Sequence, residues 1–160
     1  MNNNLRNFLI CMLFLFAILL IIPLSYASEG CIPTRPDMEG PFYKPNAPLR
    51  DKTGIGLTVK GRVLSYPDCK PIPKAVIEYW HTNPDGVYDD AHRAILFSDK
   101  DGGYKLITDF PGIYPGRPPH IHLKIKAAGF RPLTTQLYFK KRASEEIFDI
   151  VLIPDKDMKP

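Results

Sequence analysis

Residues 109–126 read DFPGIYPGRPPHIHLKIK, and the last seven of them decide the fold. In HIHLKIK, three apolar residues alternate with His120, His122 and two lysines, which is the period of a β-strand and not of a helix. Neighbouring side chains on a strand point to opposite faces, so the apolar set faces a core and both histidines face away from it. The turn before the strand also brings Tyr114 and Arg117 close to the histidines.

Short apolar segments recur along the rest of the chain, and turns containing proline and glycine separate them. The sequence holds 17 prolines and 11 glycines, a spacing of turns that is typical of sandwich folds. We therefore predict an all-β fold, an antiparallel β-sandwich with an ordered N-terminal arm. Strands are expected at residues 57–65, 75–82, 104–109, 120–127, 134–140 and 148–153. Residues 144–150, SEEIFDI, favour a helical turn.

Residues 1–27 have the pattern of a secretory signal peptide. A polar start with one arginine precedes an uncharged apolar run, and Ser25 and Ala27 are the small residues that a signal peptidase requires. We expect cleavage after Ala27 and a secreted or periplasmic product without stable membrane insertion. The alternative is a retained anchor, because the apolar run is at the short end of a spanning helix. Residues 28–56 would then form the arm, and residues 57–160 a single sandwich domain.

Two cysteines, Cys31 and Cys69, remain after removal of the signal peptide. An even pair in an oxidising compartment predicts a disulfide. The alternative, lipid attachment at Cys31, fits poorly because Glu29 lies where a small or apolar residue is needed. The formal charge of +4 comes without a lysine or arginine cluster, so we expect no nucleic-acid partner.

His120 and His122 are spaced so that one metal ion could bind both imidazoles, although a surface pair that binds nothing has the same spacing. Zinc would take a further ligand from His, Cys, Asp or Glu, and Asp89, Asp90 and Asp109 are available. A secreted zinc hydrolase therefore stays open as an alternative function.

Tyr88 and Tyr114 are the other oxygen donors, each in a glycine turn. A phenol has a pKa of about 10 and ligates only when a strongly Lewis-acidic metal removes its proton, as ferric iron does. Ordinary turn packing is the alternative for both. Gln136 shares the outward direction of the histidines on its own strand. Of the remaining histidines, His81 is expected to serve packing or hydrogen bonding, and His92 to be solvated.

Four segments together resemble a known family. They are CIPTRPDMEGPFYKP at 31–45, KGRVLSYPDCKPIPKAVIEYWHTNPDGVYDD at 60–90, DKDGGYKLITDFPGIYPGRPPHIHLKI at 99–125 and TTQLYF at 134–139. The chain is similar to the intradiol ring-cleavage dioxygenases, which include the protocatechuate and catechol dioxygenases. The resemblance implies a β-sandwich that holds non-haem Fe(III).

The resemblance also implies a site and a reaction. The ligands would be Tyr88, Tyr114, His120 and His122. Arg117 and Gln136 would stabilise the substrate or its developing anion, and Tyr114 would leave the iron when a catecholate binds. The partners would be a small aromatic diol and O₂, the product a muconate-type diacid, and a homo-oligomer would be in keeping with the family. A non-catalytic transthyretin-like or carboxypeptidase-regulatory-like module would share the turns but would not need the tyrosines and histidines.

Overall fold

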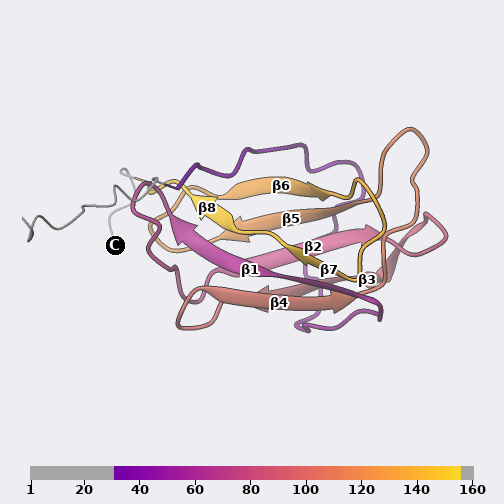
Figure 1. Ribbon diagram of the computed structural model, residues 1–160, viewed down its shortest axis with the longest axis horizontal. Coiled ribbons are helices and arrows are strands. Elements are labelled where there is room, and N and C mark those ends of the chain that lie inside the picture. Colours follow the sequence, from indigo (N-terminus) through magenta and orange to yellow (C-terminus); the bar gives the residue numbers. More distant parts are fainter. Residues whose placement is uncertain (1–30, 156–160) are drawn as a thin grey trace, which may run out of the picture.

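The computed structural model describes residues 31–155, which form eight strands and no helix. The strands are β1 (Leu57–Ser65), β2 (Val76–Thr82), β3 (Tyr88–Phe97), β4 (Gly103–Thr108), β5 (His120–Lys126), β6 (Leu133–Tyr138), β7 (Glu145–Ile147) and β8 (Ile150–Leu152). They build two four-stranded sheets that pack face to face, so the predicted β-sandwich is confirmed (Figure 1). The proposed signal peptide lies outside the described residues. Within residues 31–155, no helix has the length and apolarity to cross a membrane.

One sheet has the order β3-β2-β5-β6, and all its strand pairs are antiparallel. Its register places His122 between Trp80 on β2 and Gln136 on β6. His120 pairs with Tyr138. On β5 the three apolar residues are fully buried in the sandwich, and the histidines lie on the opposite, outer face, as the alternation predicted.

The other sheet has the order β4-β1-β7, with β8 also paired to β1. β1 and β4 are antiparallel, whereas β7 and β8 run parallel to β1. The sandwich is therefore antiparallel except at this edge. The helical turn expected at residues 144–150 is wrong, because β1 offers an unpaired edge and the backbone of this segment hydrogen-bonds to it as β7.

β3 is a strand that the sequence pattern did not predict. Its first half, YDDAHR, has no apolar alternation, and residues here were expected to form a turn and a polar loop. His92 was expected to be solvated, and this is wrong: its side chain is buried between the carboxylates of Asp89 and Asp109. The two carboxylates replace the water that an imidazole would otherwise need.

The core lies between the sheets, and the N-terminal arm, residues 31–56, contributes no buried residue to it. The arm runs outside the β3-β2-β5-β6 sheet and then turns toward the other sheet (Figure 1). Backbone bonds fasten it at Asp37 N to Thr134 O (2.8 Å), Arg50 N to Ile95 O (3.0 Å) and Thr53 N to Ile107 O (2.8 Å). A disulfide joins Cys31, at the start of the arm, to Cys69 in the turn after β1.

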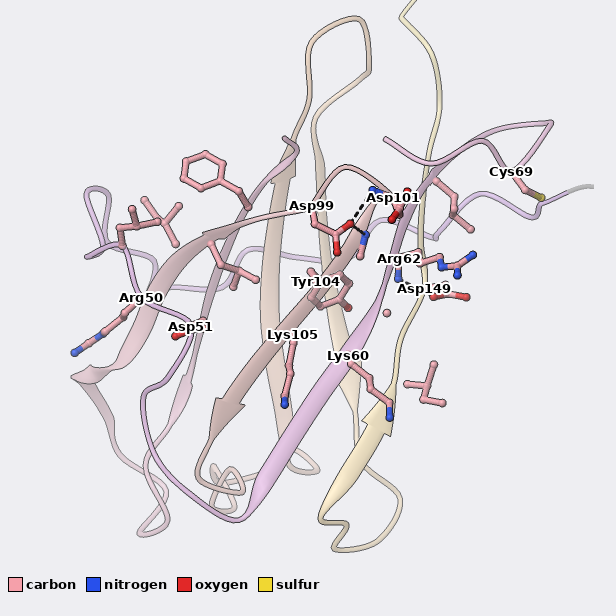
Figure 2. Close-up of a pocket in the computed structure, with 18 residues that line it drawn as sticks. Arg50, Asp51, Lys60, Arg62, Cys69, Asp99, Asp101, Tyr104, Lys105 and Asp149 are labelled. Carbon is pink, nitrogen blue, oxygen red and sulfur yellow. Dashed lines mark hydrogen bonds between the residues drawn. The ribbon is translucent and has the colours of Figure 1, made fainter. Parts of the chain in front are cut away.

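A wide groove of about 1220 Å³ lies on the β1 and β4 side of the molecule, away from the histidines. Figure 2 shows its lining, in which lysines and arginines such as Lys60 and Lys105 alternate with aspartates such as Asp99 and Asp149. None of the residues proposed for metal binding or catalysis lines this groove. The mixed charges fit a solvated sheet face.

Candidate metal centre

Three donor atoms from two strands converge outside the β3-β2-β5-β6 sheet. Tyr88 begins β3, and its hydroxyl lies 3.1 Å from His120 Nε2 and 2.9 Å from His122 Nε2. The two Nε2 atoms are 3.1 Å apart. Because β5 directs both histidines to one side, the two imidazoles meet the phenol that β3 supplies.

Hydrogen bonding alone does not satisfy this group. His120 Nδ1 lies 2.8 Å from the Pro118 carbonyl, which only accepts, so the ring proton is on Nδ1 and Nε2 presents a lone pair. If His122 Nε2 carries a proton, its buried Nδ1 is left without a hydrogen bond within residues 31–155. Three atoms at these separations can all lie ~2 Å from one cation, the usual metal–ligand length. The donor set therefore fits a metal ion.

The protonation states suit metal binding. Burial lowers the pKa of His122 to about 3, helped by the neighbouring His120. Burial also lowers the pKa of His120. Both imidazoles are thus neutral at pH 7, the form that ligates. Burial raises the pKa of Tyr88 to about 12, so its phenol stays protonated unless a strongly Lewis-acidic cation removes the proton.

His122 is held between a ring and a glycine. The indole of Trp80 stacks on it, with centroids 4.9 Å apart and an interplanar angle of 7°. On the arm, Gly40 has φ +74°, and a Cβ there would lie 3.2 Å from His122 Cε1. Glycine at position 40 therefore allows both a left-handed backbone and the close approach of the arm to the imidazole.

Contact between two turns places the Tyr114 ring beside Tyr88. Gly112 N donates to Asn83 O at 3.0 Å, and Thr82 Oγ1 donates to Gly112 O at 2.9 Å. A Cβ on Gly112 would lie 2.4 Å from a backbone nitrogen of the facing turn, so only glycine fits. The Tyr114 ring packs edge-on against Tyr88, with centroids 5.8 Å apart. Among the described residues, the Tyr114 hydroxyl makes no hydrogen bond.

Arg117 and Gln136 form a polar chain beside the histidines. Arg117 Nη2 donates to Gln136 Oε1 at 2.9 Å and to the Tyr138 hydroxyl at 2.5 Å. Gln136 Nε2 donates to the Met38 carbonyl of the arm at 2.7 Å, and Tyr138 donates to Asp37 at 2.9 Å. Burial tends to raise the pKa of Asp37, but the Met38 amide and the Tyr138 hydroxyl outweigh it and the pKa is lowered. A fixed positive charge therefore lies close to the three donors.

The aspartates that a zinc site would need are used elsewhere. Asp89 and Asp109 contact His92, and Asp90 pairs with Lys44 at 2.7 Å. Across residues 31–155, no three His, Cys, Asp or Glu side chains are grouped so as to hold a metal ion. A metal ion beside the two histidines would therefore need tyrosine oxygen as a ligand.

Sequence reasoning missed several residues of the site, namely Gly40, Phe42, Trp80 and Tyr138. Tyr138 carried a signal, because it follows Gln136 by two residues and shares its face of β6. Trp80 likewise lies opposite His122 once β2 and β5 are paired. Gly40 and the Phe42 ring, which stacks on Tyr88 at 4.3 Å, come from the aperiodic arm, where no pattern places a side chain.

Comparison with known proteins identifies relatives of this chain. The chain is similar to the dioxygenase domain of a dioxygenase carbohydrate-binding protein fusion from Streptomyces sp. SirexAA-E, with 35% identity, 78% of this chain and 100% of that chain covered, and a TM-score of 0.72. It is also similar to the chlorocatechol 1,2-dioxygenase of Pseudomonas sp. strain P51, at 31% identity over 141 residues, covering 67% of this chain and 56% of the relative. The intradiol ring-cleavage dioxygenase of Tetranychus urticae shares 27% identity, with 69% and 66% covered and a TM-score of 0.65.

The relatives named here are dioxygenases, at identities of 27–35%. The chain belongs to the intradiol ring-cleavage dioxygenase family. No protein-family model matches it. The chain spans 53–56% of the length of the chlorocatechol 1,2-dioxygenases that it matches.

Proposed function

We propose that this chain uses O₂ to cleave a catechol-type aromatic diol between its two hydroxyl-bearing carbons, giving a muconate-type diacid. The proposed cofactor is one non-haem ferric ion, held by Tyr88, Tyr114, His120 and His122. The observation that carries the proposal is the convergence of the Tyr88 hydroxyl and both Nε2 atoms within 3.1 Å of one another. Family membership and the names of the relatives support the reaction class.

The ferric ion would supply Lewis acidity toward the diol and a template for both reactants. Two neutral imidazoles and two phenolates would hold it, with the Trp80 ring keeping His122 oriented. Tyr114 is suited to a second role, because its side chain is half-buried and its hydroxyl has no hydrogen bond among the described residues. Its oxygen can turn away from the centre and accept a proton from the incoming diol.

Arg117 would stabilise negative charge that develops on the ring-opening product. Its guanidinium is fixed by Gln136 and Tyr138, while Nη1 has only a weak contact with Met38 Sδ at 3.9 Å. A preorganised cation of this kind acts more strongly in a site that excludes water. The arm contributes to that exclusion by covering His122.

We also propose that the protein is exported, with cleavage after Ala27. The apolar N-terminal run and the disulfide of the described part support this. N-terminal sequencing of protein from an export-competent host would test it. A mature N-terminus other than Ser28, or a lipid on Cys31, would contradict it.

Metal analysis and oxygen uptake test the catalytic proposal. Purified protein should hold about one ferric ion per chain, as one set of four ligands implies, and should show the red-brown absorption of tyrosinate bound to iron. It should consume O₂ one to one with some member of a panel of catechols and hydroxyquinols, and yield the intradiol diacid. Stoichiometric zinc in a colourless protein would favour a hydrolase instead. Absence of any bound metal would favour a non-catalytic module of the transthyretin-like kind.

Replacing Arg117 tests whether this residue stabilises negative charge in the reaction or is needed to bind the metal. Arg117→Ala should keep the iron and its colour but lose on the order of 10²–10³ in turnover, the usual effect of removing one such donor. Arg62→Ala is the matched control, because Arg62 lies in the groove on the other sheet. Loss of iron from Arg117→Ala would show that the assigned role is wrong.

A further inference from the structure

The pairing of β2 and β3 is interrupted directly after Tyr88. Trp80 pairs with Arg93, and Thr82 pairs with Tyr88. The chain therefore advances five residues along β3 where it advances two along β2. Residues 89–92 are therefore a bulge without partners in the ladder. Since Tyr88 is the residue before this bulge, the ladder alone does not fix the direction of its phenol.

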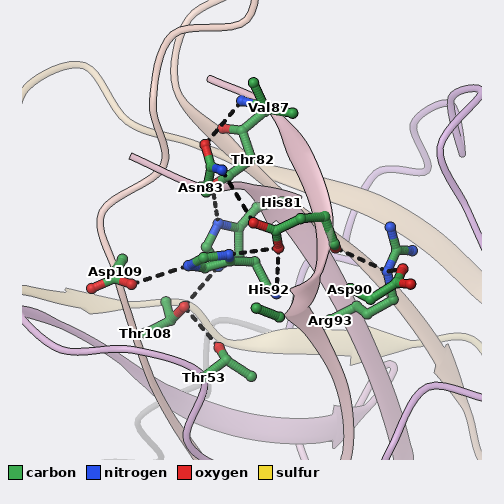
Figure 3. A network of polar contacts seen from close by, with 12 residues as sticks. Thr53, His81, Thr82, Asn83, Val87, Asp90, His92, Arg93, Thr108 and Asp109 are labelled. Carbon is green, nitrogen blue, oxygen red and sulfur yellow. Dashed lines mark hydrogen bonds and ion pairs between the residues drawn. The ribbon is translucent and has the colours of Figure 1, made fainter. Parts of the chain in front are cut away.

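His92 fastens the bulge from the inner side of the sheet. Its Nδ1 lies 2.8 Å from Asp89 Oδ1, and its Nε2 lies 3.0 Å from Asp109 Oδ2 (Figure 3). Both ring nitrogens therefore lie within hydrogen-bonding distance of a carboxylate oxygen. His92 is only 7% exposed, so these contacts are shielded from water.

Both carboxylates are fixed in turn. Asp89 Oδ1 also accepts from the His92 amide at 3.0 Å, and Asp89 Oδ2 accepts from Asn83 Nδ2 at 3.1 Å. Asp109, which follows β4, accepts from the Ile55 amide at 3.0 Å. His92 thus links the bulge after Tyr88 to the opposite sheet.

Arg93 and Arg50 fasten the same bulge from the arm side. Arg93 Nε donates to the Asp89 carbonyl and Arg93 Nη1 to the Phe42 carbonyl, both at 3.1 Å. The Phe42 ring stacks on Tyr88 at an interplanar angle of 13°. Arg50 Nη2 lies 3.0 Å from two carbonyl oxygens of the bulge, those of Asp90 and Ala91, and from the carbonyl oxygen of Arg93, the residue after the bulge. The bulge is therefore held by side chains in place of strand pairing.

We propose that His92, clamped between Asp89 and Asp109, is a positioning residue for Tyr88. It fixes the bulge so that the Tyr88 hydroxyl stays within 3.1 Å of both histidine Nε2 atoms. His92 itself does not touch the substrate or the metal. The effect of His92 on metal binding rests on the proposed function. The position of the Tyr88 hydroxyl beside the two histidines does not depend on that function.

Nuclear magnetic resonance of the metal-free protein tests the placement. With labelled aromatic side chains, the wild type should show contacts from Tyr88 to the rings of Phe42 and His122, whose centroids are 4.3 and 5.9 Å away. A folded His92→Ala protein should lose the contact between Tyr88 and His122. The matched control is His81→Gln, because His81 is also buried and packs edge-on against His92, with ring centroids 5.2 Å apart, but its hydrogen bonds go to Thr82 and Thr108 and not to the bulge. The control should keep the contact.

The affinity of the protein for ferric ion tests how the loss of His92 affects the proposed metal site. His92→Ala should lower affinity for ferric ion about 10–100-fold, the usual effect of removing a group that orients a ligand. It should also lower the tyrosinate absorption per bound ion. In a Tyr88→Phe background, His92→Ala should add no further loss, because it acts through Tyr88.

The outcomes separate the two proposals. Should His92→Ala not fold, Asp109→Asn removes the far end of the same clamp and should give the same changes. A folded variant that keeps the contact between Tyr88 and His122 overturns the positioning role. An additive loss of affinity in the Tyr88→Phe background overturns it as well. A wild type that binds no ferric ion defeats the proposed function alone, and the resonance contacts still decide the role of His92.

Discussion

Each of the three converging donors is oriented by a contact that involves no metal. The Pro118 carbonyl fixes the tautomer of His120, and Trp80 and Gly40 enclose the ring of His122. Phe42 stacks on Tyr88. Such contacts reduce the freedom that a ligand loses on binding, so they contribute to affinity without touching the ion.

Gly40→Ala should weaken the centre. The new Cβ would lie 3.2 Å from His122 Cε1, and φ +74° disfavours any L side chain, so the imidazole or the arm must shift. We expect ferric affinity to fall about 10-fold or more. Gly129→Ala is the control, because Gly129 has φ +79° with nothing within 4 Å of its added Cβ. Both variants should lose a similar unfolding free energy in urea, and equal ferric affinities for the two would contradict the assigned contact.

At the scale of elements, the alternation of apolar and polar residues was sufficient to predict those strands that have one apolar face. It predicted β5 and β6 and placed His120, His122 and Gln136 on a common side. It failed for β3, because the first half of that strand is a bulge held by ion pairs and arginine bonds between residues distant in sequence. The position of Tyr88 relative to the histidines therefore could not be predicted from spacing, and came only from family resemblance.

The buried end of the sandwich should be sensitive to acid. His81 on β2 reaches across to Thr108 on β4, with Nε2 2.8 Å from the hydroxyl, and it is fully buried. Burial lowers the pKa of His81 to about 4 from its usual 6.5. The unfolded chain thus binds a proton between pH 6.5 and pH 4 that the folded chain does not, so stability is complete above this window and falls as pH decreases through it.

The expected loss from His81 is about 3 kcal/mol at pH 4. His120 and His122 add in the same direction in metal-free protein, because their pKa values are also lowered. Urea unfolding of metal-free wild type and His81→Gln at pH 7, 5.5 and 4.5 measures the effect. The variant should show a shallower pH dependence, and identical slopes would exclude His81 as a source.

On the scale of the whole molecule, the arm joins the parts that build the centre. It contacts β6 near its start, supplies Gly40 and Phe42 to the site, and ends beside β3 and β4. The sequence predicted an ordered arm from its prolines but gave no path for it. Its path is determined by backbone hydrogen bonds to strand edges, which every residue type except proline can donate.

The disulfide should stabilise the molecule by holding the start of this arm. Cys31 and Cys69 are 38 residues apart in sequence, for which loop-closure entropy gives roughly 3–4 kcal/mol. Urea unfolding of the oxidised protein and of the Cys31→Ser/Cys69→Ser variant should differ by about that amount. The variant should also release ferric ion faster, because Gly40 lies nine residues after position 31 and against His122. Mass spectrometry of non-reduced peptides must first show the linked pair. Two free thiols, or equal unfolding midpoints for both proteins, would mean that backbone bonds alone keep the arm over the centre.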